Sequence, residues 1–474
     1  MEPRACRSEK LPHLVTVMPA LTTDRAATSI IATSLDNDNH RHILDKIVKL
    51  RRKASDNRRR SIKTALAHSS RPEYQQIQNH LDPAVPYKSF IMNDNTSYPQ
   101  VSTSLVLKSF NGQLDLEKTP IPKPTPPGSV IVRVLSTPVR PHQRAGFHGK
   151  SFLSFTPPYN PGDGGVGRVI SVGPDAVSLK PGQLVYMSPF VTARDDRSTR
   201  VLLGLHDGGG PDRDSKLFNL WKGFWRDIAI LPAEIVVPLN EKVLVDEMGY
   251  SFGDLNYIQR LSVAYGGIKA ADIQAGETVI VAPATGHFSG AVVELAAQIG
   301  CNVIALTRSA SKLEPLIARF PRVTALELTG DEKTDTEAIR ALAPDGVDAY
   351  IDVSPPAATE GPHHLTVSIS LLRCFGRVVF LGMMFDIKVN YAGLMLRDIT
   401  IRAKFMYTRE ELASLIKMIE TGVLKLGKEA GHEIVERGFR LDEWERAVTV
   451  AETAMAWGQQ VLLFPSADEE RVDE

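Results

Sequence analysis

Hydrophobic and polar positions alternate in short runs over the stretch that begins at residue 101. Residues 101–107 alternate, and similar runs at 128–136, 167–173 and 183–187 are separated by glycine and proline. Short alternating strands divided by such turns are typical of antiparallel β structure. The pattern therefore predicts a compact, barrel-like β domain.

The pattern changes near residue 277. Residues 278–283 form a continuous apolar run, residues 289–299 have helical periodicity, and residues 302–307 are apolar again. A strand, a helix and a strand within about 30 residues form a βαβ unit, which implies a parallel sheet buried on both faces. The second region is therefore predicted to be a doubly wound α/β domain. Its later elements, and those that end the chain, are predicted as strands at 349–353 and 377–382, a helix at 409–421 and a strand at 460–464.

The first hundred residues have a different composition. They contain no glycine, and their 16 Lys and Arg exceed their 10 Asp and Glu, whereas the whole chain has 55 of each. A helix is predicted over residues 40–68. We interpret residues 1–100 as a poorly ordered basic extension, a solvated tail in its simplest form. A nucleic-acid or nuclear-import patch, an organelle transit peptide and an incorrectly predicted gene start are the alternatives.

Overall composition excludes several classes of protein. Hydrophobic residues make up 43% and charged residues 23% of the chain, which is unlike a mainly disordered protein. The chain has no run of eighteen apolar residues, so no membrane span is predicted. The balanced charge favours neither nucleic acid nor an anionic membrane as partner. Three cysteines cannot form a disulfide framework or a four-cysteine zinc site. We therefore expect a cytoplasmic protein.

A turn between residues 281 and 290 is the main chemical signal. It reads VAPATGHFSG, with Ala284, Gly286 and Ser289 at the positions of a dinucleotide-binding glycine motif. Small residues let the backbone approach a pyrophosphate, and the helix that follows directs its free N–H groups at it. An ordinary strand–helix turn is the alternative. The cofactor-binding residues predicted here are Thr285, Gly286, His287, Phe288 and Ser289, with His287 contacting the cofactor through its backbone or its side chain.

The second strand of the βαβ unit ends about 20 residues further on, where the adenosine ribose is bound. An NAD site usually has a carboxylate there, but this chain has Thr307 and Arg308, with Lys312 one helical turn later. Hydroxyls and cations suit a 2′-phosphate, so we predict NADP(H) as cofactor, unless Arg308 is merely a surface residue. Ser354 and Gly382 end later strands and are predicted to lie near the nicotinamide.

Residues 101–465 resemble the medium-chain dehydrogenase/reductase superfamily. The resemblance is carried, in order, by SVIVRV at 129–134, PGDGGVGRVI at 161–170, LKPGQLV at 179–185, AGETV at 275–279 and GRVVFLG at 376–382. It implies a GroES-like β-barrel catalytic domain joined to a Rossmann cofactor domain. The segments 282–286 and 404–407 look most like fungal alcohol dehydrogenase-like members, many of which act in small-molecule biosynthesis.

The resemblance also implies a division of the chain and a departure from the family. The catalytic domain would span residues 101–246, completed by about 388–474, and the Rossmann domain residues 247–387. Members with catalytic zinc have a cysteine at the position of Arg140 and a His-Glu pair at Asp163 and Gly164. Because these ligands and the structural-zinc cysteines are missing, no metal is expected.

Without zinc to polarise a carbonyl, reduction of a double bond conjugated to a carbonyl is the easier reaction. Arg140 is predicted to hold an enolate oxygen and His142 to donate a proton, unless both are surface or supporting residues. Asp163 either faces the cleft or only caps its turn. Tyr265, and also Tyr159, would line the nicotinamide pocket or belong to the core.

The predicted function is NADPH-dependent reduction of an enone, quinone or carbonyl in a small lipophilic substrate. A zinc-independent secondary alcohol dehydrogenase and a non-catalytic NADP-binding scaffold are the alternatives. Residues 188–224 form an insertion rich in glycine and aromatic residues, interpreted as a lid or as a loop with core aromatics. Because family members commonly pair through Rossmann edge strands, the resemblance suggests a homodimer formed near residues 382–401.

Overall fold

The computed structural model describes residues 98–209, 215–359, 363–436 and 438–466. The basic extension and the helix predicted over residues 40–68 lie outside the described residues. Within those ranges, every helix is too short or too polar to cross a membrane.

A six-stranded sheet forms the centre of the second region, and all its neighbouring strands are parallel. Its first βαβ unit lies within two residues of the predicted bounds, so that prediction is confirmed. The strand order is that of a doubly wound dinucleotide fold. In spatial order the strands are β12 (Val323–Glu327), β11 (Asn302–Thr307), β10 (Thr278–Ala282), β13 (Val347–Asp352), β14 (Leu372–Phe380) and β15 (Thr400–Ala403).

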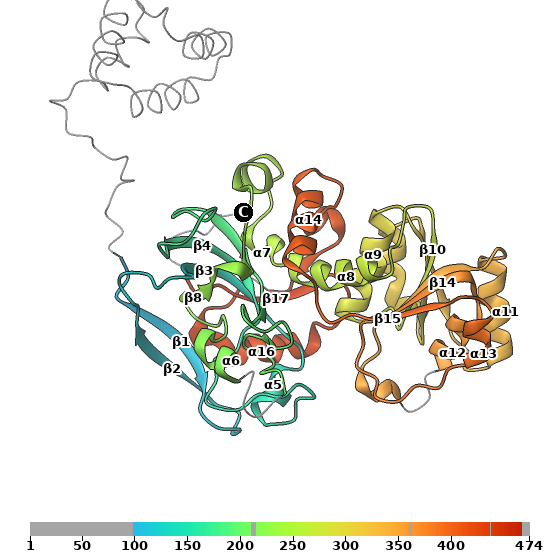
Figure 1. Cartoon of the computed structure of the whole chain (residues 1–474), viewed down its shortest axis with the longest axis horizontal. Helices are drawn as coiled ribbons and strands as arrows, with labels where there is room; N and C mark the ends of the chain where they lie inside the picture. Colours follow the sequence, from blue (N-terminus) through green and yellow to red (C-terminus); the bar gives the residue numbers. More distant parts are fainter. Residues whose placement is uncertain (1–97, 210–214, 360–362, 437, 467–474) are drawn as a thin grey trace, which may run out of the picture. The chain divides into compact units, whose positions relative to one another are not determined.

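Both faces of this sheet are covered, as the continuous apolar runs predict. Val279 and Val281 of β10 pack into one core cluster, and Ile280 and Ala282 into another on the opposite face. Residues alternate between the faces because successive side chains of a strand point to opposite sides. The strand β15 lies beyond residue 387, so the sheet extends past the boundary drawn from the sequence. Its helices are α9 (His287–Gln298), α10 (Glu314–Arg319), α11 (Glu332–Leu342), α12 (His363–Ser370) and α13 (Tyr391–Met395) (Figure 1).

A barrel-like sheet of seven strands is built mainly from the first region. Its longest strand, β3 (Ser129–Val139), pairs antiparallel with β4 (Gly165–Val172), β8 (Ile228–Pro232) and β17 (Gln459–Leu463). The last of these shows that the end of the chain returns to complete this sheet, beside α16 (Trp444–Thr453) (Figure 1). The remaining strands are β5 (Leu184–Met187), β9 (Val236–Pro238) and β16 (Glu433–Ile434), with separate pairs β1 (Val101–Leu107) and β2 (Leu114–Pro120), and β6 (Phe190–Thr192) and β7 (Arg200–Leu202).

Two aromatic residues of the insertion 188–224, and the tryptophan after it, lie in the core. Phe218, Phe224 and Trp225 are buried in the same cluster as the strands of the barrel, and the Trp225 indole donates to the carbonyl of Pro138 at 3.1 Å. Side chains fixed in this way cannot cover and uncover a cleft. The described residues of the insertion therefore favour core aromatics over a lid.

Two longer helices connect the two sheets. The helix α8 (Ile258–Ala270) packs along α9, and α14 (Arg409–Glu420) packs on α8. Thr408 begins α14 with its hydroxyl accepting from the Glu411 N–H, and the Glu411 carboxylate accepts from the Thr408 N–H. This reciprocal cap explains why the helix predicted at 409–421 begins where it does.

Candidate active site

The sequence-predicted cofactor residues gather at one edge of the parallel sheet. The turn after β10, Thr307 at the end of β11, Ser354 after β13 and Gly382 after β14 all follow the carboxyl ends of their strands. In a doubly wound sheet, ligands bind at this edge, where the strand order reverses between neighbours. Here that place lies between β10 and β13.

The turn after β10 presents a helix N-terminus. Gly286 precedes α9 with an extended backbone, and its N–H donates to the Ser289 hydroxyl at 2.9 Å. Ser289 is buried and serves as the local cap, while the first N–H groups of α9 have no partner within the helix. At Gly290 a β carbon would lie 2.7 Å from Cδ1 of Trp457. Close packing against Trp457 therefore requires a residue without a side chain at Gly290. The free N–H groups at the start of α9 give the turn an anion-binding geometry.

The ribose end of the site keeps two unpaired cations. Arg308 and Lys312 are exposed, and no ion pair joins either of them to another described residue. The Thr307 hydroxyl accepts from the backbone of Ser309 at 3.0 Å. The nearby Glu327 carboxylate accepts from the Ala310 N–H at 2.8 Å. The arrangement leaves both cations available to a phosphate.

Ser354 and Gly382 lie together, but the Ser354 hydroxyl is already engaged. It donates to the Asp352 carboxylate at 2.9 Å and lies 2.8 Å from Nε2 of His364. The same carboxylate accepts from the Tyr350 hydroxyl at 2.6 Å. A β carbon at Gly382 would clash with the Ser354 backbone. The Ser354 backbone is engaged as well, because its N–H donates to Asp352 Oδ1 at 3.0 Å and its carbonyl accepts from the Met383 N–H at 2.8 Å.

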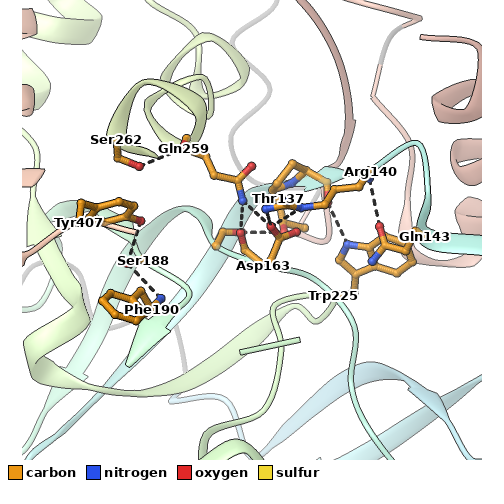
Figure 2. A network of polar contacts seen from close by, with 12 residues as sticks. Thr137, Arg140, Gln143, Asp163, Ser188, Phe190, Trp225, Gln259, Ser262 and Tyr407 are labelled. Carbon is orange, nitrogen blue, oxygen red and sulfur yellow. Dashed lines mark hydrogen bonds and ion pairs between the residues drawn. The ribbon is translucent and has the colours of Figure 1, made fainter. Parts of the chain in front are cut away.

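A hydrogen-bonded ion pair lies where the resemblance places zinc ligands (Figure 2). Arg140 follows β3, and its Nε lies 2.5 Å from Oδ2 of the buried Asp163, which its Nη2 also contacts. Gln259, on α8, donates to the same Oδ2 at 2.7 Å and to the Asp163 carbonyl. Asp163 therefore does more than cap its turn, because it anchors a guanidinium. Sequence reasoning missed Gln259.

Charge at this pair is fixed beside the phosphate turn. Burial raises the pKa of the Asp163 carboxyl, and Arg140 and Gln259 oppose that rise. Arginine stays protonated in proteins, and its Nε and Nη2 both contact Oδ2 of Asp163, so these contacts are charge-assisted. The Arg140 guanidinium also lies over the ring of Phe288, 5.1 Å from its centroid. Its Nη1 donors are not used by Asp163, which leaves a positioned cation with spare N–H groups.

The other predicted catalytic residues are less closely placed. His142 is exposed and precedes the short helix α5 (Gln143–Phe147) without capping it. Tyr265 is half-buried on α8, where burial and then Glu411 raise its pKa. No hydrogen bond among the described residues joins Tyr265 to Arg140 or Asp163. Tyr159 is buried in the barrel core, and its ring centroid lies 4.3 Å from that of Phe155 and 6.1 Å from that of Phe218.

His287, the first residue of α9, is a neutral imidazole in this fold. Burial first, and the charge of Arg260 second, lower its pKa to about 3, against a backbone hydrogen bond with Ala454. Its buried Nε2 has no hydrogen-bond partner. The phosphate turn therefore has a polar atom that lacks a partner among the residues that the structure describes.

Metal-ligating side chains do not gather in the described part of the chain. No group of three or more of its His, Cys, Asp and Glu side chains is arranged to hold a metal ion, and the pair at the expected zinc position includes a guanidinium, which cannot be a ligand. The absence of zinc stays a prediction, now supported by the residues that surround that position.

Two family descriptions match the chain. Residues 126–241 match the alcohol dehydrogenase GroES-like domain, and residues 289–421 match the zinc-binding dehydrogenase family. An alcohol dehydrogenase of Rhizobium meliloti (strain 1021) is 24% identical over 338 residues, which is 68% of this chain and 88% of the relative. Dehydrogenase FUB6 of Fusarium oxysporum is 22% identical over 284 residues, covering 56% of this chain and 66% of its own length.

Solved structures show the same fold at low identity. AibC superposes with a TM-score of 0.62 at 20% identity, over 78% of this chain and 98% of its own. A putative zinc-binding dehydrogenase from Sinorhizobium meliloti 1021 bound to NADP gives 0.59 at 20% identity, over 77% and 100%. Together with the two domain matches, in this order along the sequence, they confirm the predicted fold. The chain belongs to the medium-chain dehydrogenase/reductase superfamily.

Proposed function

We propose that this oxidoreductase uses NADPH to reduce an enone, quinone or carbonyl of a small lipophilic substrate without a metal. The observation that carries the proposal is the Arg140 guanidinium, anchored by the buried Asp163 and Gln259 next to the phosphate turn. A cation in this place would act as zinc does in other members, by stabilising negative charge on a substrate oxygen.

The chain's own residues fit a dinucleotide. The α9 N-terminus and the partnerless His287 Nε2 suit the phosphates, and a bound reduced nicotinamide would supply a hydride. Arg140 would then donate its spare N–H groups to the oxygen on which negative charge develops. The carboxylate of Asp163 and the amide of Gln259 would hold the guanidinium in one orientation, so that little reorganisation is needed. His142 or solvent would supply the proton that completes the reduction of the substrate.

Arg308 and Lys312 support NADPH over NADH, as does the NADP-bound neighbour. The variant Arg308→Ala should bind NADPH about 10- to 100-fold more weakly, because a charge-assisted contact to the 2′-phosphate is lost. Its affinity for NADH should change by less than about twofold, since NADH lacks that phosphate. Fluorescence titration of the purified protein with each nucleotide measures both.

The same titration tests the proposed function. A parent protein that binds neither nucleotide would exclude the proposal. Binding without oxidation of NADPH across enones, quinones and ketones would favour the scaffold alternative. Oxidation of secondary alcohols with NADP⁺, but no reduction of enones, would favour the alcohol dehydrogenase alternative.

We also propose that the free edge of the six-stranded sheet pairs with a second copy. All four residues of β15 are exposed, and the segment before it exposes Phe385, Tyr391 and Leu396 by 73–80%. An unpaired edge beside exposed apolar side chains is typical of an interface. Light scattering should give a dimer for the parent, and a monomer for Phe385→Asp with Leu396→Asp. A monomeric parent at about 50 μM would exclude a stable dimer.

A further inference from the structure

A buried arginine on α8 has no fixed partner for part of its charge. Arg260 is 8% exposed, and its Nη1 has no hydrogen-bond partner in the described part of the chain. Its guanidinium lies 5.3 Å from the ring centroid of Tyr257. Burial lowers the pKa of Arg260, which expresses the cost of keeping this charge away from water. Such a cost is usually offset by an anion.

The neighbours of Arg260 do not supply that anion fully. Burial raises the pKa of the Tyr257 hydroxyl well above its ordinary value, so this group stays neutral. The carboxylate of Glu294 attracts Arg260 from further away, but Glu294 accepts from Trp457 Nε1 at 2.9 Å and lies 2.9 Å from Nε2 of His432. Arg140 adds a repelling positive charge.

Arg260 lies on α8, which packs along the helix α9 that follows the phosphate turn. The adjacent Gln259 donates to Asp163, which holds the Arg140 guanidinium over the ring of Phe288 in that turn. Burial and then the charge of Arg260 lower the pKa of His287, the first residue of α9, and Arg140 and His142 act in the same direction. Two buried nitrogen atoms, Arg260 Nη1 and His287 Nε2, lack partners here. Next to them, the first N–H groups of a twelve-residue helix are unpaired. Cations and free N–H groups around one point are suited to a ligand with more than one negative charge.

We propose that Arg260 binds the pyrophosphate of the dinucleotide cofactor, supplying from α8 the positive charge that the turn after β10 lacks. The proposal rests on the proposed function, because it needs a dinucleotide as ligand. The glycine motif of this turn is incomplete, with Ala284 at its first position. A guanidinium matches two phosphate oxygens at once, and thus adds to the backbone contacts a contact that the motif does not provide.

The test separates the pyrophosphate from the rest of the cofactor. Arg260→Gln should bind NADPH about 30-fold more weakly, since one charge-assisted contact is lost. Adenosine 2′-monophosphate, which has the 2′-phosphate but no pyrophosphate, should compete with NADPH for this variant as it does for the parent, within about twofold. Arg308→Ala is the matched opposite, because it should weaken both ligands.

Folding is controlled separately. Arg226 is a second buried arginine, in the barrel core, with a partnerless Nε; Arg226→Gln should change stability without changing NADPH affinity. If Arg260→Gln does not fold, Arg260→Lys keeps the charge and should lose about three- to tenfold in NADPH affinity, because a lysine cannot make a bidentate contact. Unchanged NADPH affinity in either folded Arg260 variant overturns the proposal. A parent that binds no nucleotide overturns the proposed function instead.

Discussion

The double variant Arg140→Met with Asp163→Leu should fold and bind NADPH, yet reduce its substrate about 10²- to 10³-fold more slowly. The physical basis of this prediction is that the Arg140 guanidinium is held by the buried Asp163 and lies over the ring of Phe288 in the phosphate turn. If that guanidinium stabilises the charge that develops on a substrate oxygen, its removal raises the barrier to reduction. Binding of the cofactor should change little, because we propose that it depends mainly on the turn, Arg260 and Arg308.

Both partners must be removed together. A single Arg140→Met substitution would leave the carboxylate of Asp163, 1% exposed, without a counter-charge, at a cost of about 3–5 kcal/mol. Loss of activity could then reflect unfolding. Replacing both partners with apolar residues of similar volume is often neutral for stability, although the Gln259 amide would keep only the Asp163 carbonyl as acceptor.

A second arginine–carboxylate pair provides the control. Arg168, on β4 of the barrel-like sheet, contacts Glu241 at 2.7 and 2.8 Å. The double variant Arg168→Met with Glu241→Gln should leave the rate of reduction unchanged. Single-turnover oxidation of NADPH with an enone measures both double variants. An equal rate for the parent and the Arg140 double variant would mean that the ion pair is only structural.

The fold was predictable where local pattern and burial agree. Residues 278–307 carry a continuous apolar run, a helical period and a second apolar run, and the structure buries β10 and β11 on both faces. The short strands β6, β7 and β15 were not predicted. They span three or four residues, too few for an alternating pattern to be recognised.

The site was predictable only in part, because its contacts join distant segments. Arg140 and Asp163 stand out through the family motif, but Gln259 lies 96 residues after Asp163. No spacing links it to a motif, and no helix was predicted around it. The same holds for Arg260 beside it. Two adjacent polar residues on a buried helix could have been noticed only if that helix had been predicted, since buried polar residues usually have a partner.

The second large effect concerns stability. Glu294, on α9, and His432 are both fully buried and lie 2.9 Å apart. The Glu294 carboxylate also accepts from Trp457 at 2.9 Å and from Gln298 at 3.0 Å. Glu294→Leu keeps a similar volume but leaves these donors without an acceptor. The free energy of unfolding should fall by about 3–5 kcal/mol, measured by urea denaturation at pH 7.

The comparison with an exposed carboxylate shows whether burial is the cause. Glu452 on α16 contacts Arg144 at 2.8 Å with both side chains over a third exposed, and Glu452→Leu should cost less than about 1 kcal/mol. Equal losses at the two positions would mean that the buried carboxylate does not hold α9. A double replacement, Glu294→Leu with His432→Leu, should cost less stability than the sum of the two single losses. The reason is that each substitution removes the polar group that the other leaves without a partner. Since His432 and Trp457 belong to the segment that completes the barrel, that coupling would show that one buried carboxylate ties the helix carrying the phosphate turn to the other sheet.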